Sequence, residues 1–263
     1  SSASFKGGYN LGGTIYRDSD ASFSKSSTEE RFAGVTVALL DGDGNPVLDH
    51  NGNPMTTVTD ADGNYQFVGL GVGTYRVSIV DPNTGVLAGL TNTQAYTGRG
   101  ATQAPVTITD SSVQGVDFGF VKPATIGDRV WNDQDHNGVD NGEPGVPGVT
   151  VILKDASGTE VARTTTDSDG RYRFEGLLPG TYTVSIEVPS GYEAASTAQS
   201  VSVTEGEVNL DIDFPVTLIP TPSQPAKSIL AKTGSDAQWI AILTAMLLTA
   251  GVGALGTARK RRN

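Results

Sequence analysis

This sequence contains no cysteine and only two histidines. Without cysteine the chain has no disulfide, no thiolate metal ligand and no cysteine nucleophile. Histidine chemistry is poorly supplied as well, because His50 lies in the Asn- and Gly-rich stretch DHNGN and no nucleophile accompanies it. We therefore expect a protein that is not an enzyme.

Basic residues are also in short supply. The chain has 18 Lys and Arg against 29 Asp and Glu, which gives a formal net charge of −11. Such a chain repels a phosphate backbone, so we expect no nucleic-acid partner, and cations are the more natural ligands. The hydrophobic content of 37% is sufficient for folding, and 263 residues suit one or two domains with proper cores.

Two segments of the chain repeat each other without gaps. Residues 59–79 read TDADGNYQFVGLGVGTYRVSI and residues 166–186 read TDSDGRYRFEGLLPGTYTVSI, with identity at 14 of 21 positions. Repetition of this kind indicates two copies of one structural unit. The sequence therefore predicts two modules, at residues 6–122 and 123–217, and the first copy is longer because it includes the stretch DGDGNPVLDHNGNPM.

The apolar residues of each copy recur at spacing two, as they do in half-buried strands. Tyr65 and Phe67 show this spacing in the first copy, and Tyr172 and Phe174 show it in the second. Each copy also has an Asp-Gly pair between two such runs. This pair favours the tight turn of a β-hairpin, because glycine tolerates positive φ. We expect an all-β chain with a β-sandwich in each module.

The repeated block TDxDGxYxFxGL, followed by GTYxVSI, resembles the B-type repeat domains of Gram-positive surface adhesins, which include serine-aspartate repeat proteins and collagen adhesins. In the second module the resemblance extends over GDRVWNDQDHNGVDNGEPGVPGVTVIL. It implies a prealbumin-like, Ig-like sandwich in each module. It also implies that the modules form a stalk which carries a distal ligand-binding region.

Oxygen-bearing groups alternate in the loop after Trp131. The candidate ligands are Asp133, Asp135, Asn137, Val139 through its carbonyl, Asp140 and Glu143. Oxygens at alternate positions, with Gly138 permitting a tight turn, suit a hard cation. The loop resembles an EF-hand, and the family resemblance implies calcium. Glu143 falls one place short of the usual acidic position, so the choice between Asp140 and Glu143 stays open, and an Asx-rich turn without an ion is the alternative.

The corresponding stretch of the first module keeps two carboxylates, Asp18 and Asp20, but lacks the loop glycine. It is a second and less complete candidate for a cation site. Domains related to these modules can also form an intramolecular isopeptide bond between a lysine and an Asn or Asp. The best pair that this sequence offers for such a bond is Lys6 with Asp117.

The C-terminal part differs in composition from the modules. Residues 218–229 contain three prolines and predict an extended spacer. Residues 237–258 then form a run of 22 uncharged residues, followed by the basic cluster RKRR. At 1.5 Å per residue a helix of this length reaches about 33 Å, which is enough to cross a bilayer with its basic end in the cytoplasm. We expect one transmembrane helix there.

A pentapeptide lies between the spacer and this apolar run, and it consists of Leu230, Ala231, Lys232, Thr233 and Gly234. The order of pentapeptide, apolar helix and basic tail at residues 230–263 resembles the LPxTG sorting signals of Gram-positive surface proteins, with Ala231 in place of proline. The resemblance implies that a sortase cleaves between Thr233 and Gly234 and joins Thr233 to peptidoglycan.

Together these features predict a cell-surface stalk or adhesin-type protein that is anchored in the cell wall and contains two calcium-stabilised sandwiches. Its expected partners are the sortase, peptidoglycan, the membrane before sorting, and a host or matrix protein or carbohydrate. Two alternatives stay open. The chain is either a pilin subunit polymerised by a sortase, or the accessory part of a wall-anchored hydrolase whose catalytic domain lies upstream.

Overall fold

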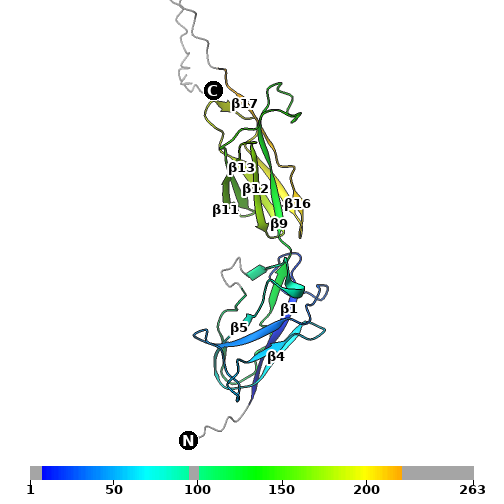
Figure 1. The fold of residues 1–263 in the computed structure, drawn as a ribbon, viewed down its shortest axis with the longest axis vertical. Coiled ribbons are helices and arrows are strands. Elements are labelled where there is room, and N and C mark those ends of the chain that lie inside the picture. Colours follow the sequence, from blue (N-terminus) through cyan, green and yellow to red (C-terminus); the bar gives the residue numbers. More distant parts are fainter. Residues whose placement is uncertain (1–7, 95–100, 221–263) are drawn as a thin grey trace, which may run out of the picture. The chain divides into compact units, whose positions relative to one another are not determined.

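The structure is a computed structural model that describes residues 8–94 and 101–220 (Figure 1). Strands dominate these residues, and they include the short 3-10 turn η1 (Gly85–Leu87). No helix in the described ranges is long and apolar enough to span a bilayer. The expected transmembrane segment, the pentapeptide and spacer residues 221–229 lie outside the described part of the chain.

The first module contains two four-stranded sheets, with strand orders β4-β1-β8-β6 and β3-β2-β5-β7. The bounds are β1 (Tyr9–Arg17), β2 (Thr36–Asp41), β3 (Thr56–Val58), β4 (Asn64–Leu70), β5 (Gly73–Ile79), β6 (Thr91–Asn92), β7 (Val106–Ile108) and β8 (Phe118–Val121). Most pairs are antiparallel, but β1 and β8 run parallel. A single apolar cluster, which includes Leu11, Val37, Phe67 and Phe118, fills this module.

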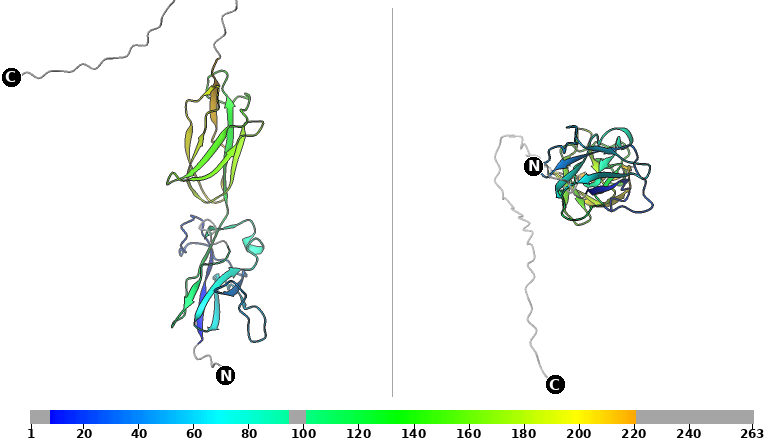
Figure 2. Two further views of the ribbon diagram at one scale, coloured as in Figure 1. Left: turned by 90° about the vertical axis from the view of Figure 1, so that its left-hand side faces the viewer. Right: turned by 90° about the horizontal axis from the view of Figure 1, so that it is seen from below.

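The second module repeats this plan, with sheets β12-β9-β17-β14 and β11-β10-β13-β15, and β16 pairs with β9 (Figure 2). The bounds are β9 (Ala124–Asn132), β10 (Thr150–Asp155), β11 (Glu160–Thr165), β12 (Arg171–Leu177), β13 (Gly180–Ile186), β14 (Tyr192–Glu193), β15 (Ala198–Val203), β16 (Val208–Asn209) and β17 (Phe214–Leu218). It has its own apolar cluster, which includes Ile126, Val151, Phe174 and Phe214. The prediction of an all-β chain with two sandwich modules is confirmed.

The repeated sequence block folds identically in the two copies. Strands β4 and β12 show the same alternation, in which every buried position carries an aromatic or aliphatic residue. Tyr65 donates its hydroxyl to the carbonyl of Val116 at 2.5 Å, and Tyr172 donates to the carbonyl of Ile212. Burial raises the pKa of both tyrosines above the usual range. Each tyrosine therefore stays protonated and ties its strand to the segment before the last strand of the module.

The two Asp-Gly turns also share one geometry. The hairpin prediction for them is wrong, because each turn leads from one sheet of its module to the other, from β3 to β4 and from β11 to β12. The Asp60 side chain accepts the backbone N–H groups of Asp62 at 3.0 Å and Asn64 at 2.9 Å, and Gly63 has a φ of 70°. The turn of the second module repeats these bonds with Asp167, Asp169, Arg171 and Gly170. The first aspartate of each turn thus stabilises the turn, as the turn interpretation of these residues expects.

Candidate metal centre

The acidic loop of the second module begins where β9 leaves its sheet. Asp133 is only 6% exposed, and its backbone N–H still bonds the carbonyl of Val216 on β17 at 2.9 Å. Its carboxylate points back into the loop and accepts the N–H groups of Asn137 at 3.1 Å and Gly138 at 3.0 Å. His136 and Gly138 both have positive φ, at 62° and 73°. The loop therefore winds around the buried Asp133 carboxylate.

Three carboxylates converge in this loop. Asp133, Asp135 and Glu143 each offer an oxygen, and these oxygens all lie within 4.8 Å of one another. Glu143 is 9% exposed; its Oε1 accepts the N–H of Gln134 at 2.5 Å, whereas its Oε2 is buried without a hydrogen-bond partner. A buried carboxylate oxygen without a partner is costly. A hard cation would supply the missing partner, so these residues fit the calcium ion that the sequence predicts.

The other expected ligands of this loop have partners of their own. Asn137 Oδ1 accepts the N–H of Val139 at 2.6 Å, and Val139 itself is 61% exposed. Asp140 lies outside the three-carboxylate group and forms an ion pair with Arg129. Burial raises the pKa of Asp140, but the N–H of Gly142 and the Arg129 guanidinium outweigh it and hold the pKa below its usual range. Of the two alternatives, Glu143 is the one placed beside Asp133.

The first module builds the same loop without the glycine. Asp18 is fully buried, and its carboxylate accepts the N–H groups of Ser22 at 2.9 Å and Phe23 at 3.1 Å. Burial raises the pKa of Asp18. Ala21 and Phe23 have φ values of 52° and 60°, at the places that His136 and Gly138 occupy in the second loop. Phe23 therefore adopts a left-handed conformation that a non-glycine residue rarely takes.

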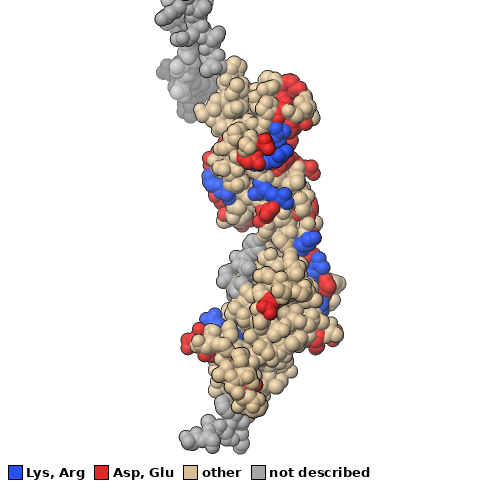
Figure 3. Space-filling model, in the orientation of Figure 1, with Lys and Arg blue, Asp and Glu red and all other residues tan. Residues whose placement is uncertain are grey.

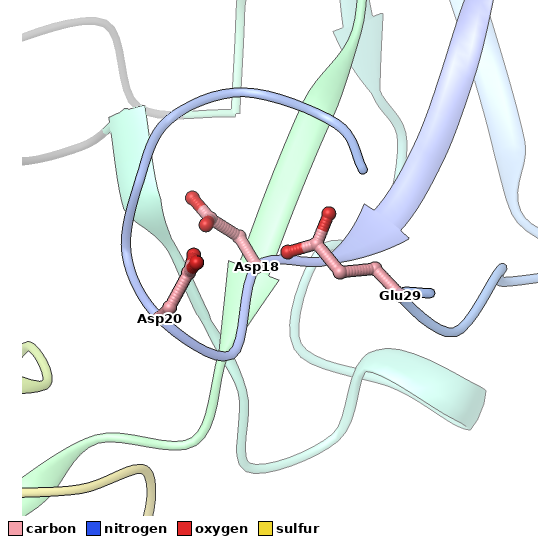
Figure 4. Close-up of side chains that lie close together, drawn as sticks. All are labelled: Asp18, Asp20 and Glu29. Carbon is pink, nitrogen blue, oxygen red and sulfur yellow. The ribbon is translucent and has the colours of Figure 1, made fainter. Parts of the chain in front are cut away.

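A glutamate that the sequence analysis missed completes this group. Figure 4 shows the carboxylates of Asp18, Asp20 and Glu29 turned toward one another, and one oxygen from each lies within 4.8 Å of the others. Glu29 Oε2 accepts the N–H of Ser26 at 2.7 Å, while its Oε1 is buried without a partner, as is Oε2 of Glu143. Counting from the aspartate pair of each loop would have suggested Glu29, because Glu143 occupies nearly the same position.

Only one member of the expected isopeptide pair, Asp117, lies among the described residues. Asp117 lies 3.4 Å from the Nζ of Lys25 and accepts the N–H of Thr14 at 2.7 Å. Lys25 also donates to Thr14 Oγ1 at 2.9 Å. Lys6, which the sequence proposes as the partner of Asp117, lies outside the described residues.

Acidic side chains gather over the loop after β9, with basic side chains next to them (Figure 3). The family model of the SdrD B-like domain matches residues 9–117 and 124–217, each of which contains one of the two loops. The chain belongs to the SdrD B-like domain family. The B-like domains of this chain thus each bring an Asp-x-Asp pair and a distant glutamate together.

Two staphylococcal relatives share these B-like domains. Serine-aspartate repeat-containing protein D of Staphylococcus aureus (strain Newman) is 40% identical over 196 residues, which are 72% of this chain and 14% of that protein. Serine-aspartate repeat-containing protein F of Staphylococcus epidermidis is 35% identical over 205 residues, which are 74% of this chain and 11% of that protein. The chain thus spans only about a seventh of the length of the first of these relatives.

Solved structures of pilins resemble the B-like domains more distantly. The minor pilin GBS52 of Streptococcus agalactiae aligns with 83% of this chain and all of its own, at a TM-score of 0.35 and 15% identity. A streptococcal ancillary pilin covers 81% of this chain and 63% of its own, at a TM-score of 0.36 and 19% identity. Likenesses at this level carry no argument about function.

Proposed function

We propose that this chain is a non-enzymatic stalk segment of a Gram-positive surface protein, and that calcium bound in the loops after β1 and β9 stabilises its two sandwiches. The observation that carries the proposal is the buried, unpartnered Oε2 of Glu143 beside Asp133 and Asp135. The equivalent arrangement around Asp18 and Glu29 supports the same role for the first module.

Calcium suits these loops because it takes six to eight oxygen ligands in a flexible geometry. In the second module Asp133, Asp135 and Glu143 would hold the ion, and Asn137, loop carbonyls and water would complete its shell. The ion would neutralise three carboxylates that otherwise repel one another. An ion that binds only the folded state adds about 2.7 kcal/mol of stability at 100 times its Kd. Such a stalk would resist unfolding and proteolysis while calcium is present.

The test is calorimetric unfolding of the whole chain in calcium and in a chelator. We expect calcium to raise the unfolding temperature, and we expect Asp133→Asn to abolish this shift for the second module. Asp155→Asn is the matched control, because the Asp155 carboxylate caps an exposed hairpin through the N–H groups of Ser157 and Thr159 and belongs to neither acidic group. Identical unfolding with calcium and with chelator would refute the proposal.

We further propose that the chain is anchored covalently to peptidoglycan through Thr233, after the apolar run at 237–258 has held it at the membrane. The pentapeptide Leu230 to Gly234, the apolar run and the basic tail support this step. In a Gram-positive host with a matching sortase, Thr233→Ala should move the protein from the wall fraction to the membrane fraction. Lys232→Ala is the control, since it alters the variable position of the motif and should leave sorting intact.

A further inference from the structure

We propose that Arg129 is the positioning residue of the second calcium loop, because it fixes the backbone of Glu143 and withholds Asp140 from the ion. This inference rests on the proposed calcium function. Arg129 lies on β9, and its side chain is only 21% exposed. Its position in the strand, four residues before Asp133, brings the guanidinium beside the loop rather than into the three-carboxylate group.

The guanidinium of Arg129 joins three separate segments. Its Nε donates to the carbonyl of Asp169 in the turn between β11 and β12 at 3.0 Å. Nη2 donates to the carbonyl of Glu143 at 2.5 Å, and Nη1 donates to the carboxylate of Asp140. The far end of the loop is thereby fastened to the β11–β12 turn, next to Glu143, whose Oε2 is buried without a hydrogen-bond partner. Only a planar, five-donor group reaches three acceptors in this way.

The contacts of Arg129 have two consequences for ion binding. Because the Glu143 carbonyl is held, the Glu143 side chain starts from a fixed backbone and stays directed toward Asp133. Because the Asp140 carboxylate is paired with Arg129, only three carboxylates converge on the site. A fourth carboxylate would add repulsion in the empty loop. Residues that orient metal ligands in this manner typically change metal affinity 10- to 100-fold when they are replaced.

The first module has the same loop without an arginine at the position of Arg129. Thr14 occupies the strand position that corresponds to Arg129, since Asp18 and Asp133 follow at the same distance. Lys25 lies there instead, and its ammonium group contacts Thr14 Oγ1 and the Asp117 carboxylate. Glu29 is also more exposed than Glu143. We therefore expect the first loop to bind calcium more weakly than the second.

The experiment is a calcium titration of the whole chain by calorimetry, with Arg129→Met, Arg129→Lys and Asp140→Asn as variants. Arg129→Met should weaken the tighter calcium site about 10-fold or more, and Arg129→Lys should restore only part of the loss because an ammonium group lacks the planar fork. Asp140→Asn should leave the affinity within about threefold. An unchanged affinity in Arg129→Met, or an equal loss in Asp140→Asn, would overturn the inference.

A second readout separates this inference from the calcium proposal. Amide hydrogen exchange in chelator reports on the N–H of Gln134, which bonds Glu143 Oε1 at 2.5 Å. Arg129→Met should accelerate exchange of this amide several-fold while the Tyr172 amide on β12 keeps its protection. If the wild-type chain binds no calcium but exchange responds as expected, the calcium proposal fails and the positioning role stands. If the Gln134 amide does not respond, the positioning role fails.

Discussion

The two acidic loops reach the same backbone shape from different side chains. Each begins with a buried aspartate, Asp18 or Asp133, whose carboxylate accepts the N–H groups four and five residues later. Each also ends at a glutamate with one buried, unpartnered oxygen. They differ at the fifth residue after the aspartate, where Phe23 stands in the first loop and Gly138 in the second.

This comparison shows that the buried carboxylate, rather than the glycine, determines the turn. Phe23 takes a φ of 60°, close to the 73° of Gly138, even though a side chain makes that conformation unfavourable. Two hydrogen bonds to a buried, charged acceptor are worth more than the local strain of one residue. The glycine of the second loop therefore eases this turn but is not required for it.

The largest effect should follow from removing the buried carboxylate. Asp18→Ala leaves the N–H of Phe23 without an acceptor, and Asp133→Ala does the same to the N–H of Gly138. The other N–H of each loop keeps a second carboxylate, from Asp20 or Asp135. We expect each substitution to cost its own module about 2 to 3 kcal/mol in calcium-free solution. Asn at either position keeps one acceptor oxygen and should cost less. Chemical denaturation followed module by module measures this. If only one of the two substitutions destabilised its module, the two buried carboxylates would not be equivalent.

A smaller and equal effect is expected from the buried tyrosines. Tyr65→Phe and Tyr172→Phe each remove one hydroxyl that bonds a buried carbonyl, at a cost of about 1 to 2 kcal/mol. The two modules should lose the same amount, because the surrounding strands have the same burial pattern. Tyr75→Phe is a suitable control, since its hydroxyl bonds the carbonyl of Gly71 in a partly exposed turn. Unequal losses would mean that the repeat differs in its packing.

The fold was predictable because its signals are local and occur twice. Spacing-two apolar runs such as Tyr65 and Phe67 become buried faces, and the Asp-Gly pairs become tight turns, although these turns join two sheets instead of two paired strands. The convergence of Asp133, Asp135 and Glu143 was partly predictable from the sequence as well, since alternate residues in a tight loop turn toward one centre.

The remaining features depend on contacts between distant segments. Glu29 follows a polar run with no regular spacing, so only its distance along the chain from Asp18, which nearly matches that of Glu143 from Asp133, points to it. The contacts of Arg129 include the carbonyl of Asp169 in the β11–β12 turn, which lies 40 residues away in sequence. The positive φ of Phe23 contradicts its local preference, so residue statistics alone favour another conformation.

Substitutions at the fifth residue after the buried aspartate should have modest and opposite effects on the stability of the two modules. Phe23→Gly should stabilise the first module by about 1 kcal/mol, because it relieves the left-handed strain and Phe23 is 48% exposed. Gly138→Ala should destabilise the second by a similar amount, since a Cβ there meets no atom within 4 Å and only the φ of 73° opposes it. Thermal unfolding measures both. Stabilisation by Gly138→Ala would contradict the strain argument.

The smallest effect distinguishes the modules by pH. Asp128 of the second module has a pKa of about 6, raised first by burial and then by the charge of Asp213. The first module has Gly13 at this position, where a Cβ would lie 2.0 Å from the carbonyl oxygen of Val116 and no carboxylate can fit. We therefore expect the pH dependence caused by Asp128 in the second module alone.

Proton binding by Asp128 sets the direction in which the stability of the second module changes with pH. The folded chain holds the Asp128 proton more tightly than the unfolded chain, so stability falls as the pH rises from about 4 through 6. Because Asp128 is partly exposed, we expect a loss of less than about 1 kcal/mol. Asp128→Asn should remove the loss, so that variant and wild type have equal stability near pH 4 and the variant is more stable at pH 7. Denaturant unfolding across this range, in chelator, measures the difference, and a wild-type advantage at pH 7 would show that Asp128 is stabilised as a carboxylate.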